Sequence, residues 1–151
     1  MNIALLITHG LFAVALLGAL THQALGTVWP RKPGQRDFVA RFRGVNGVGY
    51  TDAVIVLYIA TFIMGGIVYT IYRIEVRPPL EALQDLPTVG LFELKEHFLA
   101  FGLAMLPAYW FFWHRRPEQR LTRTMITVLL ALIVWWSFLV GHIVNNVRGF
   151  A

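Results

Sequence analysis

Four long apolar stretches, separated by short polar segments, take up most of this chain and restrict what it can fold into. The stretches run over residues 3–28, 52–72, 88–113 and 124–147, and the first of them contains no Lys or Arg. A transmembrane helix needs about 20 consecutive apolar residues, so each stretch is long enough to cross a bilayer. Because backbone polar groups find no water in the hydrocarbon core, such spans must be α-helices. The pattern predicts an all-α integral membrane protein, a four-helix transmembrane bundle.

The composition supports this prediction. Of the 151 residues, 57% are hydrophobic and 14% are charged, whereas soluble domains have roughly 45–50% apolar and about 25% charged residues. Four spans and their connections use nearly the whole chain, so we expect a single transmembrane domain over residues 1–151. The sequence contains no Cys, which excludes disulfides, Cys-ligated iron–sulfur clusters and covalently attached c-type haem within this chain.

The positive charge is concentrated in two of the three connections. Of the thirteen Lys and Arg, five lie in the segment 29–49 and four lie in the segment 114–123, whereas the connection 73–87 is nearly neutral. Lys and Arg collect in cytoplasmic loops. We therefore expect the first and third connections in the cytoplasm and both termini on the non-cytoplasmic side of a bacterial-type inner (plasma) membrane. In this multi-pass protein the basic segments face the lipid bilayer, and nucleic acid is not an expected partner.

This orientation places three of the five histidines at one depth, near the outer face: His9, His97 and His142. Ionisable residues inside a span cost at least about 2.5 kcal/mol at its centre, and they are usually functional or paired. Six further polar residues are predicted at the same level: Tyr69, Tyr72, Glu93, Glu96, Asn145 and Asn146. Together they form the candidate site.

Angular position then separates the polar residues of the third span. At about 100° per residue, Glu93 and Glu96 lie within about a third of a turn of His97. The same rule puts Lys95 on the other side of the helix, about 160° from Glu93. We therefore expect Lys95 to face away from the site and to extend its ammonium to the headgroups.

Three functions for this cluster remain open on the sequence. In the first, two of the three histidines hold a b-type haem from different helices, and the six polar residues surround them. In the second, His9, Glu93, His97 and His142 bind an iron, copper or zinc ion, because Glu93 and His97 are spaced i, i+4 and project from one face. In the third, no cofactor is bound and the cluster is a hydrogen-bonded plug in a structural subunit of a larger membrane complex.

The segment 9–18, with the sequence HGLFAVALLG, resembles the first helix of small haem-binding membrane proteins of the CopD-like group, which includes the protoporphyrinogen oxidase type. These proteins share a first-helix histidine, a basic cytoplasmic loop before the second helix and a polar start of the third helix. Arg41-Phe42-Arg43 and Lys95 match that layout, so the resemblance covers the first three helices. It implies a haem-binding bundle. In the oxidase type a third-helix lysine works with the histidine, whereas the predicted face here favours His97 as the partner of His9.

We therefore expect one b-type haem near the outer face, in a subunit that transfers electrons. Other membrane or periplasmic redox subunits are the expected partners, because a bundle with short loops has little surface of its own for a substrate. The sequence leaves open whether the protein is itself an enzyme.

Overall fold

The computed structural model describes residues 3–29, 34, 38 and 47–148, and most of these residues are helical, with no strand among them. The predicted all-α fold is thereby confirmed. The helices, in chain order, are α1 (Ile3–Val28), α3 (Gly47–Ile71), the π-helical turn η1 (Tyr72–Val76), α4 (Arg77–Ala82), α5 (Leu86–Arg115) and α6 (Arg120–Arg148).

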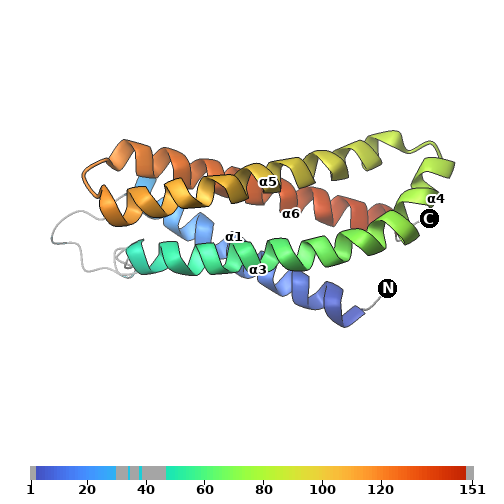
Figure 1. The fold of residues 1–151 in the computed structure, drawn as a ribbon, viewed down its shortest axis with the longest axis horizontal. Coiled ribbons are helices and arrows are strands. Elements are labelled where there is room, and N and C mark those ends of the chain that lie inside the picture. Colours follow the sequence, from blue (N-terminus) through green and yellow to red (C-terminus); the bar gives the residue numbers. More distant parts are fainter. Residues whose placement is uncertain (1–2, 30–33, 35–37, 39–46, 149–151) are drawn as a thin grey trace.

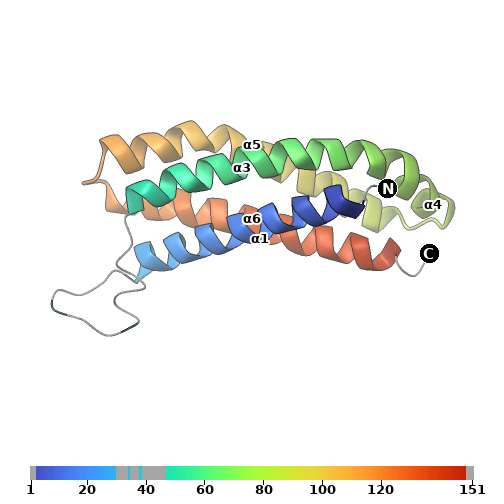
Figure 2. The ribbon, with the colours of Figure 1, turned by 90° about the horizontal axis from the view of Figure 1, so that it is seen from below.

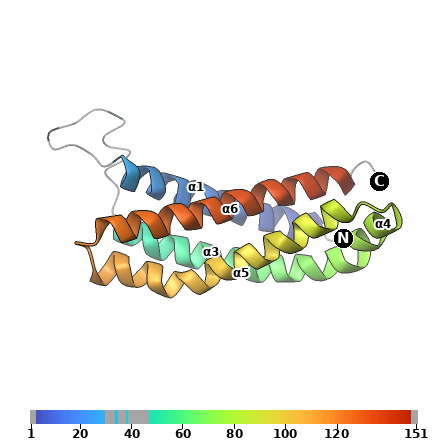
Figure 3. The same ribbon diagram turned by 90° about the horizontal axis from the view of Figure 1, so that it is seen from above.

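The four long helices form a bundle in which each helix runs antiparallel to the long helix before it in the chain (Figure 1). α1 packs against α3 and α6, and α5 packs against the same two helices, so the four helices form a closed ring. Figures 2 and 3 show the two chain ends near α4, at the end of the bundle opposite the turn between α5 and α6. Both ends of the chain therefore lie on the same side of the bundle.

Three helices of the described chain are long and apolar enough to cross a membrane: Ile3–Val28, Gly47–Ala82 and Arg120–Asn146. This identifies the chain as a membrane protein by helix length and composition. The predicted span 3–28 coincides with α1, whereas α3 begins five residues before the predicted position 52 and α5 extends to both sides of 88–113. α5 is not among the three apolar helices, and it carries Glu93, Lys95 and Glu96 in its first half.

The second apolar segment continues past its predicted end at Tyr72 through η1 and α4. Pro78 and Pro79 have no N–H, so neither can donate a helical hydrogen bond to the preceding turn. The N–H of Arg77 instead donates to the carbonyl of Tyr72, five residues back, as in a π-helix. Beyond α4, the Asp85 carboxylate accepts a hydrogen bond from the Thr88 N–H at 3.4 Å and caps α5.

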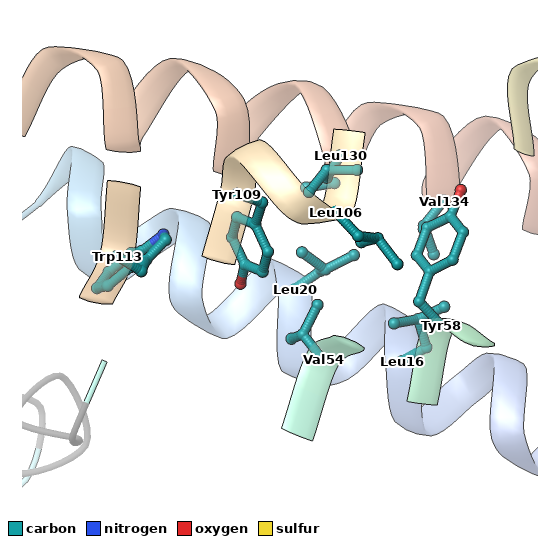
Figure 4. Packing of buried hydrophobic residues seen from close by; sticks show 10 residues of the cluster. Leu16, Leu20, Val54, Tyr58, Leu106, Tyr109, Trp113, Leu130 and Val134 are labelled. Carbon is teal, nitrogen blue, oxygen red and sulfur yellow. The ribbon is translucent and has the colours of Figure 1, made fainter. Parts of the chain in front are cut away.

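The main apolar core lies where all four helices meet (Figure 4). Tyr58 of α3 crosses to α5, and its hydroxyl donates to the Leu99 carbonyl at 2.9 Å. Gly102 permits this approach, because a Cβ at that position would overlap the Tyr58 hydroxyl. Each long helix contributes at least two buried residues to this core: Leu16 and Leu20; Val54 and Tyr58; Leu106, Tyr109 and Trp113; and Leu130, Ala131 and Val134.

A buried glutamine connects three of the helices on the side of this core away from the chain ends. Gln23 of α1 donates to the Gly47 carbonyl and the Thr51 hydroxyl of α3, both at 3.0 Å, and its side-chain oxygen accepts from the Tyr109 hydroxyl of α5. Hydrogen bonds of this kind between helices help to set their register in a membrane.

Candidate functional site

A cavity of about 290 Å³ lies between the four long helices and η1, on the side of the core nearer to the chain ends. This volume is just below the range of roughly 300–1,000 Å³ for small-molecule pockets. The wall is mostly apolar. Its ionisable and uncharged polar side chains include His9, Tyr72, Lys95, Glu96, Ser137, His142 and Asn145.

His9 reaches the cavity from α1 and packs against α3. Gly65 faces its ring, and a Cβ at Gly65 would lie 3.4 Å from the Cε1 atom of His9. The Nδ1 atom of His9 is buried and has no hydrogen-bond partner within the part of the chain that the structure describes. Buried polar atoms are nearly always hydrogen-bonded, so an unpaired one next to a cavity is a candidate ligand-binding atom.

His142 faces the same cavity from α6, although its side chain is exposed on the other side. The hydrogen bond from Trp135 Nε1 to Thr21 Oγ1, at 2.9 Å, sets the register between α6 and α1. Counting from that bond at about 1.5 Å per residue, His142 lies within about two helical turns of the level of His9. The structure therefore presents two imidazoles from neighbouring helices to one cavity.

Lys95 lines this cavity, and the prediction that it faces away from the site is wrong. Its Nζ lies 2.9 Å from Glu96 Oε1 and 4.0 Å from the centre of the Phe92 ring, and the side chain is 12% exposed. Residue spacing gives angles between positions on one helix, but it does not tell which direction faces the bundle. The prediction assumed that His97 points inward, and this assumption set the rotation of the whole helix.

His97 and Glu93 do not line the cavity, which corrects their predicted place in the site. His97 is exposed, and its Nδ1 donates to the Glu93 carbonyl at 2.8 Å. The Glu93 carboxylate accepts from Arg77 Nη1 at 2.7 Å, and Arg77 also donates through Nε to Glu81 at 2.7 Å. Glu93 therefore belongs to an ion network between α4 and α5.

The predicted metal site of His9, Glu93, His97 and His142 is consequently not assembled. In the described ranges no three His, Asp or Glu side chains form a group that could hold a metal ion. The i, i+4 spacing of Glu93 and His97 does place both on one face of α5, but that face points away from the cavity.

Tyr72 closes the outer part of the cavity from η1. Its side chain is 4% exposed, and its ring stacks on Phe92 with the ring centres 3.8 Å apart. The hydroxyl is buried without a hydrogen-bond partner in the described chain. Tyr69 stacks against the same two rings at 6.1 Å but does not line the cavity.

Of the predicted site residues, the structure thus brings five to the cavity: His9, Tyr72, Glu96, His142 and Asn145. Four predicted residues lie elsewhere: Tyr69, Glu93, His97 and Asn146. Lys95 and Ser137 line the cavity without having been predicted. Ser137 lies one turn before Gly141, which also lines the cavity, but neither residue was predicted there. No local signal distinguished Lys95 from His97.

No family model matches this chain, and neither a curated protein nor a solved structure matches it. The chemistry of the cavity is therefore inferred from the side chains that line it. They include a pair of imidazoles, one ion pair and the hydroxyls of Tyr72 and Ser137, which have no hydrogen-bond partner among the described residues, in an otherwise mostly apolar wall.

Proposed function

We propose that this protein binds one b-type haem in the cavity between its four long helices and serves in electron transfer. The observation that carries the proposal is the pair His9 and His142, which approach one cavity from neighbouring helices, with the buried Nδ1 of His9 lacking a partner in the described chain. Imidazoles are common axial ligands of haem iron. Cofactor sites of helix bundles are built in this way, from side chains on facing helices.

The lining residues extend far along the bundle. Along α6 the lining residues extend from Val134 to Asn145, about 17 Å at 1.5 Å per residue. With a volume of about 290 Å³, the cavity is therefore long and narrow. On three of the helices small residues leave room in the cavity: Gly10, Ala13, Gly65 and Gly141. Three phenylalanine side chains also form part of its wall: Phe62, Phe92 and Phe138.

The residues that line the cavity would have different roles in such a haem site. His9 and His142 would hold the iron, and the bound group would supply a centre for reversible one-electron transfer. Lys95 and Glu96 neutralise each other, which reduces the cost of placing two charges in a mostly apolar wall. The position of Lys95 beside the cavity of His9 also agrees with the layout of the CopD-like group, in which a third-helix lysine works with the first-helix histidine.

We further infer that α5 crosses the membrane as a fourth span. It has 30 residues, about 45 Å of helix, and it packs against α3 and α6. It also connects the end of α3 to the start of α6, which lie at opposite ends of the bundle (Figure 1). If α3 and α6 both span, the segment between them must return across the bilayer.

The charge distribution supports an orientation with both termini outside. Arg115, Arg116, Arg120 and Arg123 lie around the turn between α5 and α6, at the end opposite the chain ends. By the positive-inside rule this end is cytoplasmic. The haem would then lie towards the outer face of a bacterial-type inner membrane, within reach of a periplasmic or membrane redox partner.

The test is reconstitution of the purified protein with haem, followed by absorption spectra of the oxidised and reduced forms. We expect a Soret band in the wild type and its loss or displacement in His9→Ala and in His142→Ala. The matched control is His97→Ala, which removes an exposed histidine of α5 and should leave the spectrum unchanged.

Two results would contradict the proposal. A wild-type protein that shows no Soret band with excess haem would favour the alternative of a cofactor-free structural subunit. An equal loss of the Soret band in His97→Ala would show that the haem does not bind in this cavity.

A further inference from the structure

Tyr72 has a buried hydroxyl that none of the described side chains or backbone groups satisfies. The residue lines the cavity from η1, and its side chain is 4% exposed. A buried hydroxyl without a hydrogen bond lowers stability, so its presence in a cavity wall points to a partner that the ligand supplies.

The ring of Tyr72 is held in place, so its hydroxyl cannot turn to another acceptor. Phe92 stacks on it with ring centres 3.8 Å apart and planes inclined by 14°, and Tyr69 stacks on it at 6.1 Å with planes inclined by 21°. Ser137 differs in this respect, because a serine hydroxyl can rotate to the carbonyl one turn earlier on its own helix. Thr61 and Thr127 make that bond here, to Leu57 and Arg123.

Lys95 lies on the opposite side of Phe92. The Tyr72 ring covers one face of Phe92, and Lys95 Nζ lies 4.0 Å from the centre of the same ring, so the ammonium must occupy the other face. Two hydrogen-bond donors, a hydroxyl and an ammonium, therefore flank one aromatic ring at the outer part of the cavity.

Among the described residues, the inner part of the cavity offers no comparable fixed donor. Leu16 and Val134 line it there, and the Tyr58 hydroxyl already donates to the Leu99 carbonyl at 2.9 Å. A ligand with a polar edge and an apolar edge would therefore be oriented by this wall, with its polar edge towards Tyr72.

We propose that Tyr72 donates a hydrogen bond to a propionate carboxylate of the haem and so sets the orientation of the ring in the cavity. This inference rests on the proposed function. The two propionates are the only ionised substituents of the b-type haem macrocycle, and a carboxylate accepts a stronger hydrogen bond than a neutral group does. The acid edge of the ring then points to the outer end of the bundle.

The experiment titrates the apoprotein in detergent with two probes, haem and its dimethyl ester, and measures Kd by absorption. Tyr72→Phe should raise the Kd for haem about tenfold to a hundredfold, the range expected for a hydrogen bond to a charged group. Its effect on the Kd for the dimethyl ester should be smaller, because the ester lacks the charge. Tyr69→Phe is the matched control, since it removes a hydroxyl from the same aromatic stack but outside the cavity, and it should leave both Kd values unchanged.

The thermal unfolding of each apoprotein shows whether the fold is kept. Tyr72→Phe should unfold at the wild-type temperature or above it, because the substitution removes only an unpaired hydroxyl. An unchanged Kd for haem in a folded Tyr72→Phe protein would overturn the role of Tyr72 and leave the proposed function intact. Failure of the wild type to bind haem at all would overturn both.

Discussion

Lys95 and Glu96 are adjacent in the sequence, form an ion pair of 2.9 Å, and both line the cavity that His9 enters from the other side of the bundle. Their side chains are 12% and 29% exposed, so the pair is only partly solvated. Consecutive helical positions differ by about 100°, and two long side chains can still meet across that angle when both are directed into one cavity.

Removing one partner of this pair should destabilise the apoprotein. Lys95→Met would leave the Glu96 carboxylate in the cavity wall without its cation, and we expect a loss of about 1–3 kcal/mol, below the value for a fully buried pair because both groups retain some exposure. Thermal unfolding in detergent measures the loss. The double variant Lys95→Met/Glu96→Gln should recover most of it.

The control for this prediction is an exposed ion pair beyond the opposite end of the same helix. Arg116 and Glu118 are separated by 3.8 Å, with side chains 54% and 61% exposed. Arg116→Met should therefore change stability by less than about 1 kcal/mol. A Lys95→Met protein as stable as Arg116→Met would show that the cavity solvates the charge of Glu96 without Lys95.

Gly102 should not tolerate even a methyl group. A Cβ there would overlap the Tyr58 hydroxyl and lie 2.9 Å from its Cζ, while that hydroxyl is held by the Leu99 carbonyl. We expect Gly102→Ala to lower stability by about 1–3 kcal/mol, the usual cost of overpacking a core. The measurement is again the unfolding temperature in detergent.

Gly90 is the matched control on the same helix, because a Cβ at that position would meet no atom within 4 Å. Gly90→Ala should be neutral or slightly stabilising, since alanine is the better helix former. Tyr58→Phe in the Gly102→Ala background should restore part of the loss by removing the overlapping oxygen. If Gly102→Ala has the same unfolding temperature as Gly90→Ala, the close approach of α3 and α5 at Gly102 is wrong.

The proposed topology can be measured without first removing any native thiol, because the sequence has no Cys. Leu83, 65% exposed beyond α4, and Glu118, exposed in the turn between α5 and α6, mark the two ends of the bundle. A membrane-impermeant maleimide should label Leu83→Cys in intact cells, whereas Glu118→Cys should react only after permeabilisation. The opposite labelling would invert the orientation, and labelling of both positions in intact cells would show that α5 does not cross.

The positions of the helices follow from local features of the sequence. The apolar segment 3–28 coincides with α1 because the length of an uninterrupted apolar run determines where a helix can be buried in lipid. The short helix α4 likewise carries Pro78 and Pro79 in its first turn, where the fixed φ angle of proline favours a helix start. These signals need no information about other parts of the chain.

Which residues face the cavity was decided only by the tertiary structure. The spacing of Lys95, Glu96 and His97 gave correct angles between them, but the rotation of α5 depends on its contacts with the other helices. Gly102 lets Tyr58 reach the α5 backbone, and Gln23 accepts a hydrogen bond from Tyr109. The rotation of α5 is therefore fixed by residues of other helices that are more than forty positions away in the sequence. Those contacts turn Lys95 into the cavity and His97 out of it, because a helix can bury only one side against its neighbours.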